Sequence, residues 1–310
     1  MELSVTFSDN PALQECLVLT HRIGRGKFSV YQAYSESRSN TYAIKIFPKD
    51  AFGTAQYLKE KLISKLNHHN IVQNISIQVH GTEFYGHLTE FAKYSDLSEF
   101  INSDLINTEI LVRTYFHHLI NGLEHAHSRG IAHLDLKPSN LIVDEGFIMK
   151  IIDFDQAQRI TNERMTSGGT EGYRAPEVLD GVCRNLGAAD VYSAGIILYA
   201  LKTGKLPFLE IEDENGWTLR NYKTFTHKNS TFWRLKGEHK GDMTFFSEDF
   251  ITLVNGMLNE NPEKRFTIKD IKESQWFQGP ILEGRVLEEQ MSHKWKMHEI
   301  KKKYGLEAVL

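Results

Sequence analysis

One segment near the middle of this 310-residue chain constrains its fold and chemistry more than any other. Residues 133–143 place a carboxylate (Asp135), an ammonium group (Lys137) and an amide (Asn140) directly before a short apolar strand. These groups suit phosphoryl transfer, because a carboxylate can take a proton, an ammonium group can neutralise phosphate charge and an amide oxygen can bind a metal ion. Taken alone, the segment also fits an ordinary polar turn before a buried strand. The motifs around it decide between these two interpretations.

A glycine turn between apolar strands comes earlier in the chain. A third apolar stretch then carries Ala43 and Lys45, so the alternation predicts strand, turn, strand and a further strand. Glycine has no Cβ, which allows the backbone of such a turn to lie against phosphate oxygens. The turn runs through Ile23, Gly24, Arg25, Gly26, Lys27, Phe28, Ser29, Val30 and Tyr31.

A second acidic motif follows the central segment. The apolar residues 150–152 lead to Asp153, Phe154 and Asp155, so a strand would deliver the Asp153 carboxylate into the same cleft. Magnesium binds readily to one or two protein oxygens, with water and phosphate completing its octahedron. Asp153 and Asn140 are therefore the candidate metal ligands.

In this order, the segments resemble the motifs of the eukaryotic protein kinase family, of the serine/threonine type and its calcium/calmodulin-dependent-kinase-like branch. The resemblance covers about residues 15–278. It implies an α+β, two-lobed protein-kinase-like fold, with a small, mainly antiparallel β lobe with one helix (about 15–90) and a larger, mainly helical lobe (about 91–278). Residues 1–14 would be an N-terminal extension and residues 279–310 a C-terminal helical tail.

The resemblance also implies the roles of the site residues. Asp135 would be the catalytic base for serine or threonine hydroxyls of protein substrates, Lys137 would neutralise the transferring phosphoryl group, and Lys45 would orient ATP. Asn140 and Asp153 would hold Mg²⁺. The glycine turn would cover the phosphates. Val30, Ala43 and Ile142 would surround the adenine, and Glu90 and Ala92 would contact its edge through their main chain. Thr89 would be a small gatekeeper, and Asp96 would contact the ribose.

Several of these nucleotide contacts have a plainer alternative. Val30, Ala43 and Ile142 would equally serve as ordinary core residues. Asp96 also fits a helix N-cap before residues 97–100, because a carboxylate there accepts the first free amides of a helix.

The residue that pairs with Lys45 is ambiguous in the sequence. Kinases carry a glutamate for this purpose on a helix, here predicted over residues 57–66. Counting back from Asn67 in the family's usual register gives Lys59, whereas Glu60 is one place later. A shift of one residue turns a side chain by about 100°. We favour Glu60, with an exposed helix carboxylate as the alternative.

Two further motifs predict structural contacts in the large lobe. Residues 169–177 resemble the end of a kinase activation segment, so Thr170 would line the substrate site and Glu177 would pair with Arg265. A stretch that begins at Asp190 resembles the family's buried central helix, and its carboxylate would accept backbone amides of the catalytic loop. His133 would pack that loop.

The chain departs from the family pattern at three positions. Ser29 replaces the third glycine of the turn, Asp155 replaces the glycine after Asp153-Phe154, and Leu134 replaces the arginine before the catalytic aspartate. Since that arginine commonly grips a phosphate on the activation loop, Leu134 predicts activity without activation-loop phosphorylation.

Three alternatives remain open. A pseudokinase that binds nucleotide or protein would normally have lost one of Lys45, Asp135, Lys137, Asn140 or Asp153, all of which are present. His125, His127 and His133 could suggest a metal site, but they lack zinc-type ligand spacing. The tail could bind a regulatory partner such as calmodulin, or pack on the large lobe, which Leu287, Met291 and Trp295 at four-residue spacing favour.

Composition narrows the class of protein. The chain is 41% hydrophobic and 25% charged, with a formal net charge of -4, which argues against nucleic acid as a partner. Cys16 and Cys183 suggest a reducing compartment without a disulfide framework.

The first residues do not predict a signal peptide, and the apolar run 194–201 is too short to span a membrane. We therefore expect an intracellular, cytoplasmic location and leave the nucleus open.

Overall fold

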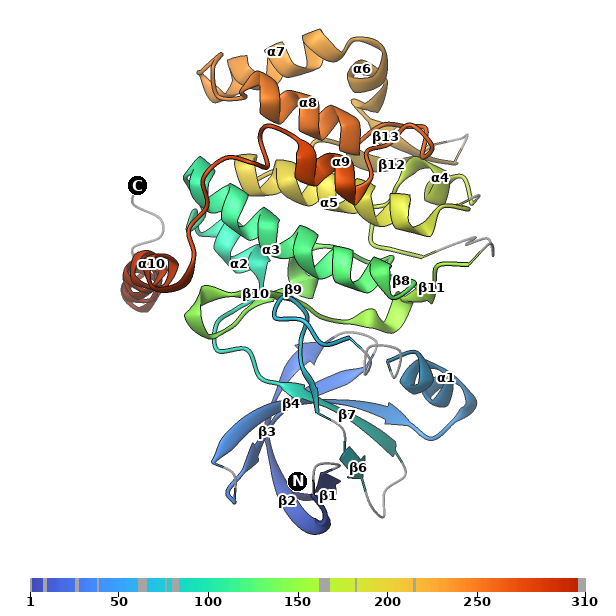
Figure 1. The fold of residues 1–310 in the computed structure, drawn as a ribbon, viewed down its shortest axis with the longest axis vertical. Helices are drawn as coiled ribbons and strands as arrows, with labels where there is room; N and C mark the ends of the chain where they lie inside the picture. Colours follow the sequence, from blue (N-terminus) through green and yellow to red (C-terminus); the bar gives the residue numbers. More distant parts are fainter. Residues whose placement is uncertain are drawn as a thin grey trace.

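The computed structural model describes residues 2–7, 10–25, 28–37, 39–60, 66–75, 77–79, 84–161, 168–181, 183–213 and 216–305. Figure 1 shows a small lobe built around a β-sheet and a larger lobe built from helices. The predicted two-lobed α+β fold is thus confirmed.

The small lobe is an antiparallel sheet with the strand order β5-β7-β4-β3-β2-β1-β6. Apolar side chains that alternate along its strands form a small core, in which Leu17, Ala33, Ile44 and Leu88 are fully buried. The predicted N-terminal extension contributes β1 and the start of β2 to this sheet. The strands are β1 (Glu2–Phe7), β2 (Asn10–Arg25), β3 (Ser29–Ser35), β4 (Asn40–Pro48), β5 (Asn74–Ile75), β6 (Ile77–Val79) and β7 (Phe84–Glu90).

The helix predicted in the small lobe is α1 (Ala51–Glu60), which begins before the predicted stretch and packs on β4. It also contacts the turn η4 (Phe154–Gln156) of the large lobe, directly after Asp153. This contact brings the end of α1 close to the candidate metal ligand.

The large lobe is organised around α5, which packs against α3 on one side and α8 on the other. Its helices are α2 (Leu97–Asn102), α3 (Glu109–Ser128), α4 (Pro176–Leu179), α5 (Leu186–Thr203), α6 (Tyr222–His227), α7 (Asn229–Lys240), α8 (Glu248–Met257) and α9 (Ile268–Glu273). Short strands pair as β8 (Ile131–Ala132) with β11 (Gln158–Arg159), β9 (Leu141–Val143) with β10 (Met149–Ile151), and β12 (Leu209–Asp213) with β13 (Gly216–Arg220).

Helix α5 is the predicted buried central helix. It is apolar on nearly all sides and buried along most of its length, as expected for a helix inside a large core. Asn185 caps its N-terminus by accepting the Ala188 N–H, and Gly204 ends it with a left-handed φ of 73°. Among the described residues, no helix is long and apolar enough to cross a membrane.

The strand β10 links the two lobes next to the candidate site. Its Ile151 N–H donates to the Asn70 carbonyl (2.9 Å), and the Val72 N–H donates back to the Ile151 carbonyl (3.0 Å). Because these bonds tie β10 to the segment that leads into β5, Asp153 has a fixed position relative to the small lobe.

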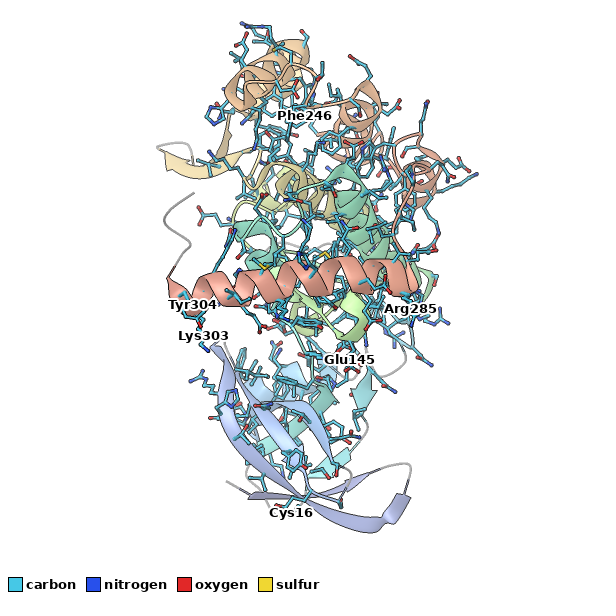
Figure 2. All side chains as sticks on the ribbon, turned by 90° about the vertical axis from the view of Figure 1, so that its left-hand side faces the viewer. Cys16, Glu145, Phe246, Arg285, Lys303 and Tyr304 are labelled. Carbon is cyan, nitrogen blue, oxygen red and sulfur yellow. The ribbon has the colours of Figure 1, made fainter. Side chains whose placement is uncertain are left out.

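The C-terminal tail forms α10 (Gly284–Tyr304), which lies across one side of the molecule in Figure 2. Leu287 and Met291 are fully buried, and the Trp295 ring stacks on Phe100 at 5.2 Å between centroids. The tail therefore packs on the large lobe, as its spacing predicted.

Candidate active site

The catalytic loop leads from β8 through the turn η2 (Pro138–Asn140) into β9. Asp135 accepts hydrogen bonds from Lys137 Nζ (2.9 Å to Oδ2) and from Asn140 Nδ2 (2.8 Å to its carbonyl, 3.2 Å to Oδ2). The predicted carboxylate, ammonium and amide thus lie together. Since the Asn140 nitrogen faces Asp135, its side-chain oxygen is the atom that remains for a metal ion.

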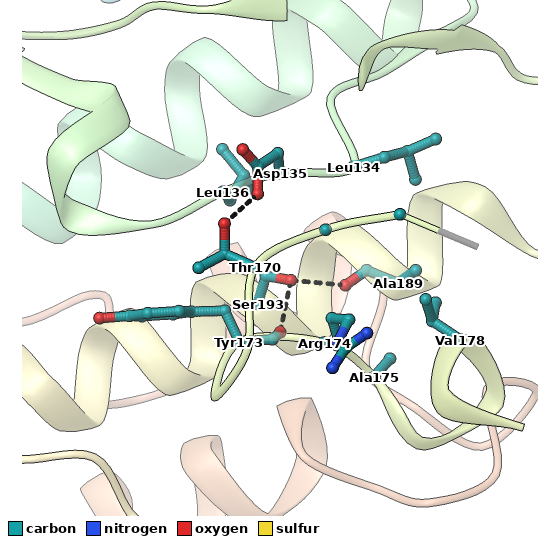
Figure 3. Close-up of a pocket in the computed structure, with 12 residues that line it drawn as sticks. Leu134, Asp135, Leu136, Thr170, Tyr173, Arg174, Ala175, Val178, Ala189 and Ser193 are labelled. Carbon is teal, nitrogen blue, oxygen red and sulfur yellow. Dashed lines mark hydrogen bonds between the residues drawn. The ribbon is translucent and has the colours of Figure 1, made fainter. Parts of the chain in front are cut away.

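Thr170 completes this cluster from the distant segment before α4. Its hydroxyl donates to Asp135 Oδ1 (2.6 Å) and accepts from Lys137 Nζ (2.7 Å). Figure 3 shows Thr170 directly beneath Asp135, at the wall of a pocket that Leu134 and Arg174 also line. Thr170 thus lies beside the catalytic loop, and its predicted role in lining the substrate site stays a prediction.

The loop is held from below by the first turns of α5. The fully buried Asp190 carboxylate accepts the N–H groups of His133 and Leu134, each at 2.7 Å, and a ring nitrogen of His127 at 2.8 Å. Leu134 has a φ of 65°, an uncommon conformation for a branched residue, so these bonds offset a local strain. The predicted role of Asp190 is confirmed.

The three histidines near the loop do not converge on one point. His133 bonds the Ile152 carbonyl (2.8 Å) and accepts the Asp135 N–H (3.2 Å), whereas His127 contacts Asp190. His125 packs on His68, with 5.0 Å between ring centroids. Among the described residues, no group of three or more His, Cys, Asp or Glu side chains is arranged to hold a metal ion.

Lys45 lies between two carboxylates from different lobes. Its Nζ is 2.6 Å from Glu60 Oε1 and 2.5 Å from Asp153 Oδ1. Burial alone would lower the pKa of Lys45, but the two carboxylates outweigh it and raise the pKa. The predicted Lys45–Glu60 pair is thus confirmed.

Glu60 is almost completely buried, and its carboxylate also lies near the His87 ring (3.4 Å). Burial would raise the pKa of Glu60, whereas the hydrogen bond with His87 and the charge of Lys45 lower it to about 2. The carboxylate is therefore charged at neutral pH. No sequence motif predicts the His87 contact, because β7 and α1 come together only in the folded small lobe.

Asp153 has the left-handed backbone conformation (φ 62°), and its side chain is one-third exposed. A carboxylate and an amide oxygen are hard ligands of the kind magnesium prefers, so Asp153 and Asn140 fit a magnesium site. The next carboxylate, Asp155, is buried. Burial raises the pKa of Asp155, and the negative charge of Asp153 raises it further.

The glycine turn is described only in part. Gly26 and Lys27 lie outside the described residues, as does the side chain of Arg25. Gly24 on β2 pairs with Val30 on β3. A Cβ on Gly24 would come within 3.1 Å of the Val30 side chain, so the close contact of the two residues favours glycine at this position. Phe28 is buried against Phe47, with 4.7 Å between ring centroids.

The residues predicted to contact adenine come from both lobes. Ala43 on β4 pairs with Thr89 on β7, and Ile142 forms a bridge with Asp96. Asp96 Oδ1 accepts the N–H groups of Ser98 (2.8 Å) and Glu99 (3.4 Å), which confirms the N-cap of α2. A ribose contact of Asp96 stays a prediction.

A charge network that the sequence did not reveal crosses this junction. Lys150 Nζ is 2.7 Å from Glu90 Oε2 and 2.8 Å from Asp144 Oδ2, and the other Glu90 oxygen accepts the Gln73 N–H. Burial alone would lower the pKa of Lys150, but Asp144 and Glu90 raise it. The Glu90 side chain therefore ties β7 to the β9–β10 hairpin.

An ion pair between Glu177, in α4, and Arg265 fixes the end of the segment that carries Thr170. Arg265 donates to both oxygens of Glu177 (2.6 and 2.9 Å), to the Ala188 carbonyl (2.8 Å) and to the Asn259 carbonyl (3.0 Å). The predicted Glu177–Arg265 pair is confirmed. Ser193 donates to the Tyr173 carbonyl (2.8 Å), as Figure 3 shows, and holds the same segment nearer the site.

Comparison with known proteins agrees with this geometry. A family model described as "Protein kinase domain" matches residues 17–277. Similar curated proteins of Oryza sativa subsp. japonica are "CBL-interacting protein kinase 11" (31% identical, covering 84% of this chain and 51% of that protein) and "CBL-interacting protein kinase 28" (31%, 88% and 61%). "CBL-interacting protein kinase 12" is 32% identical over 82% of this chain and 46% of its own length. The chain thus spans between 46% and 61% of the length of these relatives.

Proposed function

This chain belongs to the protein kinase domain family, and we propose that it transfers the γ-phosphate of ATP to serine and threonine hydroxyls of protein substrates. Asp135, Lys137 and Lys45 carry the chemistry in this proposal. The observation that supports it most directly is the Asp135 cluster, in which Lys137, Asn140 and Thr170 all contact one carboxylate.

Asp135 is the proposed catalytic base. A substrate hydroxyl that bonds one of its carboxylate oxygens would be aimed at the γ-phosphorus and would lose its proton to that oxygen as the new O–P bond forms. The bond from the γ-phosphorus to the β–γ bridging oxygen would break at the same time, and ADP would leave. The bonds from Lys137, Asn140 and Thr170 hold the carboxylate in one orientation. Its position is therefore set before the substrate arrives.

Lys137 and Lys45 supply positive charge at two points of the site. Lys137 lies next to Asp135 and would neutralise charge that develops on the transferring phosphoryl group. Lys45, held by Glu60 and Asp153, would orient the α- and β-phosphates. An intact Lys45–Glu60 pair favours this active arrangement.

Asn140 and Asp153 would hold Mg²⁺, which when bound neutralises charge on the ATP phosphates. The adenine would lie between Val30, Ala43 and Ile142, near the main chain of Glu90 and Ala92. Val30 lies on β3, Ala43 on β4 and Ile142 on β9, whereas Glu90 ends β7 and Ala92 lies in the segment that follows it.

Serine/threonine specificity is supported by Lys137 and Thr170. Both contact Asp135 and each other, so they form one wall of the acceptor site. The alternative function is a pseudokinase that only binds nucleotide or protein. It would leave five intact site residues without a catalytic role: Lys45, Asp135, Lys137, Asn140 and Asp153.

The proposal is tested by transfer of radiolabelled phosphate from ATP to generic protein substrates, followed by acid hydrolysis of the product. Phosphoserine and phosphothreonine are expected. A parallel thermal-shift titration should show that ATP stabilises the protein more with magnesium than without it, and that Asp153→Ala removes this difference. Absence of labelled product, together with magnesium-independent ATP binding, would favour the pseudokinase.

A further inference from the structure

Helix α10 has two apolar faces, and only one of them packs on the large lobe. The buried face includes Leu287 and Met291. On the opposite side, large apolar side chains are exposed near the N-terminus of the helix, at Val286 (60%), and along its C-terminal half, at Met297 (44%), Ile300 (37%) and Tyr304 (66%). The surface of interest, the outer seam, consists of residues 286, 290, 293, 297, 300 and 304.

The outer seam has the spacing of a coiled coil. Its positions follow one another in steps of four and three residues, which places them at alternating d and a positions of a heptad repeat. Gln290 and His293 are polar members of the seam, so every layer that contains one of them is weakened. Isolated exposed apolar residues are ordinary, but this series lies on one line of a helix whose other surfaces are packed or charged.

The seam is accessible and already ordered. Helix α10 stands out from the rest of the fold at the left edge of Figure 1, and it crosses the front of the molecule in Figure 2. The inner face fixes it to the large lobe, where His298 bonds Glu99 (2.8 Å) and Lys294 bonds Asn107 (2.5 Å). A partner that binds the seam would therefore not have to order the helix, which reduces the entropic cost of association.

We propose that the outer seam pairs with the same seam of a second copy of this chain, in the antiparallel direction. A two-fold axis near position 295 sets Val286 opposite Tyr304 of the second copy, and His293 opposite Met297. In this register every a position meets a d position, as an antiparallel coiled coil requires.

The charges beside the seam select this direction. Glu289 and Lys303 both occupy g positions, near opposite ends of the helix. In antiparallel pairing, the g positions of the two helices face each other, so Glu289 meets Lys303 of the second copy, and this contact occurs twice. A parallel pair would instead set Glu289 against Lys294, which already bonds Asn107. It would also set Lys296 against Lys301 in two like-charge contacts, so the charges favour the antiparallel direction.

Other charges make the association weak. Arg285 lies 3.6 Å from Glu289 within the same helix, but both side chains are exposed, so the competition is small. Lys296 is the g residue nearest the two-fold axis and would face its own copy, which opposes pairing. We therefore expect a monomer–dimer equilibrium in the micromolar range, and Lys296→Gln should strengthen it.

The experiment is sedimentation equilibrium of the whole chain at increasing protein concentration. The wild type should dimerise reversibly, and Ile300→Glu should abolish this. Glu289→Lys and Lys303→Glu should each weaken the dimer by about tenfold, equivalent to about 1.4 kcal/mol. The double variant Glu289→Lys/Lys303→Glu should recover most of the loss, since it exchanges the two charges.

Glu299→Lys is the matched control, because it makes the same charge change on an exposed residue of α10 outside the seam. It should leave the dimer unchanged, and circular dichroism should show that every variant keeps its helix. A chain that stays monomeric, a double variant that shows no recovery, or an equal effect of Glu299→Lys would each overturn the proposal. A monomer that binds an acidic protein or anionic vesicles through Ile300 would also overturn it and assign the seam to that partner.

Discussion

Glu60 Oε1 lies 2.6 Å from Lys45 Nζ, so the glutamate one place beyond the usual register of this motif forms the ion pair. Glu60 is buried, whereas the preceding residue, Lys59, is only half-buried. The pair fixes Lys45 between the small lobe and Asp153.

Glu60→Gln should lower kcat/KM for phosphoryl transfer by about tenfold or more, because Lys45 loses one of the two carboxylates that hold it. A tenfold loss corresponds to about 1.4 kcal/mol of barrier. Steady-state kinetics with a peptide substrate measure the effect, and a thermal melt checks the fold. Lys59→Gln is the control and should stay near wild-type activity. The account of the pair fails if the two variants behave alike.

Removing one partner of the Glu177–Arg265 pair should strongly destabilise the large lobe. Glu177→Gln leaves the fully buried Arg265 guanidinium without its counter-charge, and loss of such a partner costs about 3–5 kcal/mol. Urea denaturation measures the change in free energy of unfolding. Glu273→Gln, which breaks the exposed pair with Lys269, is the control and should cost only about 0–1 kcal/mol.

Activity should not depend on phosphorylation of the activation loop, because Leu134 stands where a phosphate-binding arginine would be. Protein treated with a broad phosphatase, and the combined variant Thr161→Ala/Thr166→Ala/Ser167→Ala, should keep most of their turnover. Thr166 and Ser167 lie outside the described residues. A loss of about tenfold that rephosphorylation restores would show that another basic group has replaced the arginine.

Acid should destabilise the protein partly through His68. Its ring stacks on His69 and is tilted against His125, and its Nδ1 accepts the Asn70 N–H (3.1 Å). Burial, then the charges of His69 and His125, lower the pKa of His68 to about 4, although Glu124 partly opposes this and Arg129 adds to it.

The lowered pKa means that the unfolded chain binds a proton more readily than the folded one. The stability that His68 contributes is therefore complete above about pH 6.5 and is lost as the pH falls towards about 4. Thermal melts between pH 7 and pH 4 should show a smaller loss for His68→Gln than for the wild type. Equal losses would contradict the shift.

The parts of the site that lie within one stretch of sequence could be predicted from it. The spacing of Asp135, Lys137 and Asn140 fixes their side chains on a single loop, so their convergence follows from local structure. The pairs Glu177–Arg265 and Asp190 with the loop amides span many residues, and only the resemblance to a known family predicted them.

Contacts without a sequence motif could not be predicted. Lys150 meets Glu90 because β10 lies close to the end of β7, which depends on how the lobes pack. His87 reaches Glu60 for a similar reason. The addition of β1 to the sheet was missed because residues 1–14 carry no motif, and strand pairing depends on partners far along the chain.

The central claim is that Asp135 acts as the catalytic base, and the most direct test compares turnover with ATP binding in Asp135→Asn. Turnover should fall by on the order of 10²-fold or more, because the amide cannot take the hydroxyl proton. The ATP- and magnesium-dependent rise in melting temperature should stay near that of the wild type, since the proposed nucleotide contacts lie elsewhere. Retention of more than about a tenth of wild-type turnover would contradict the assignment.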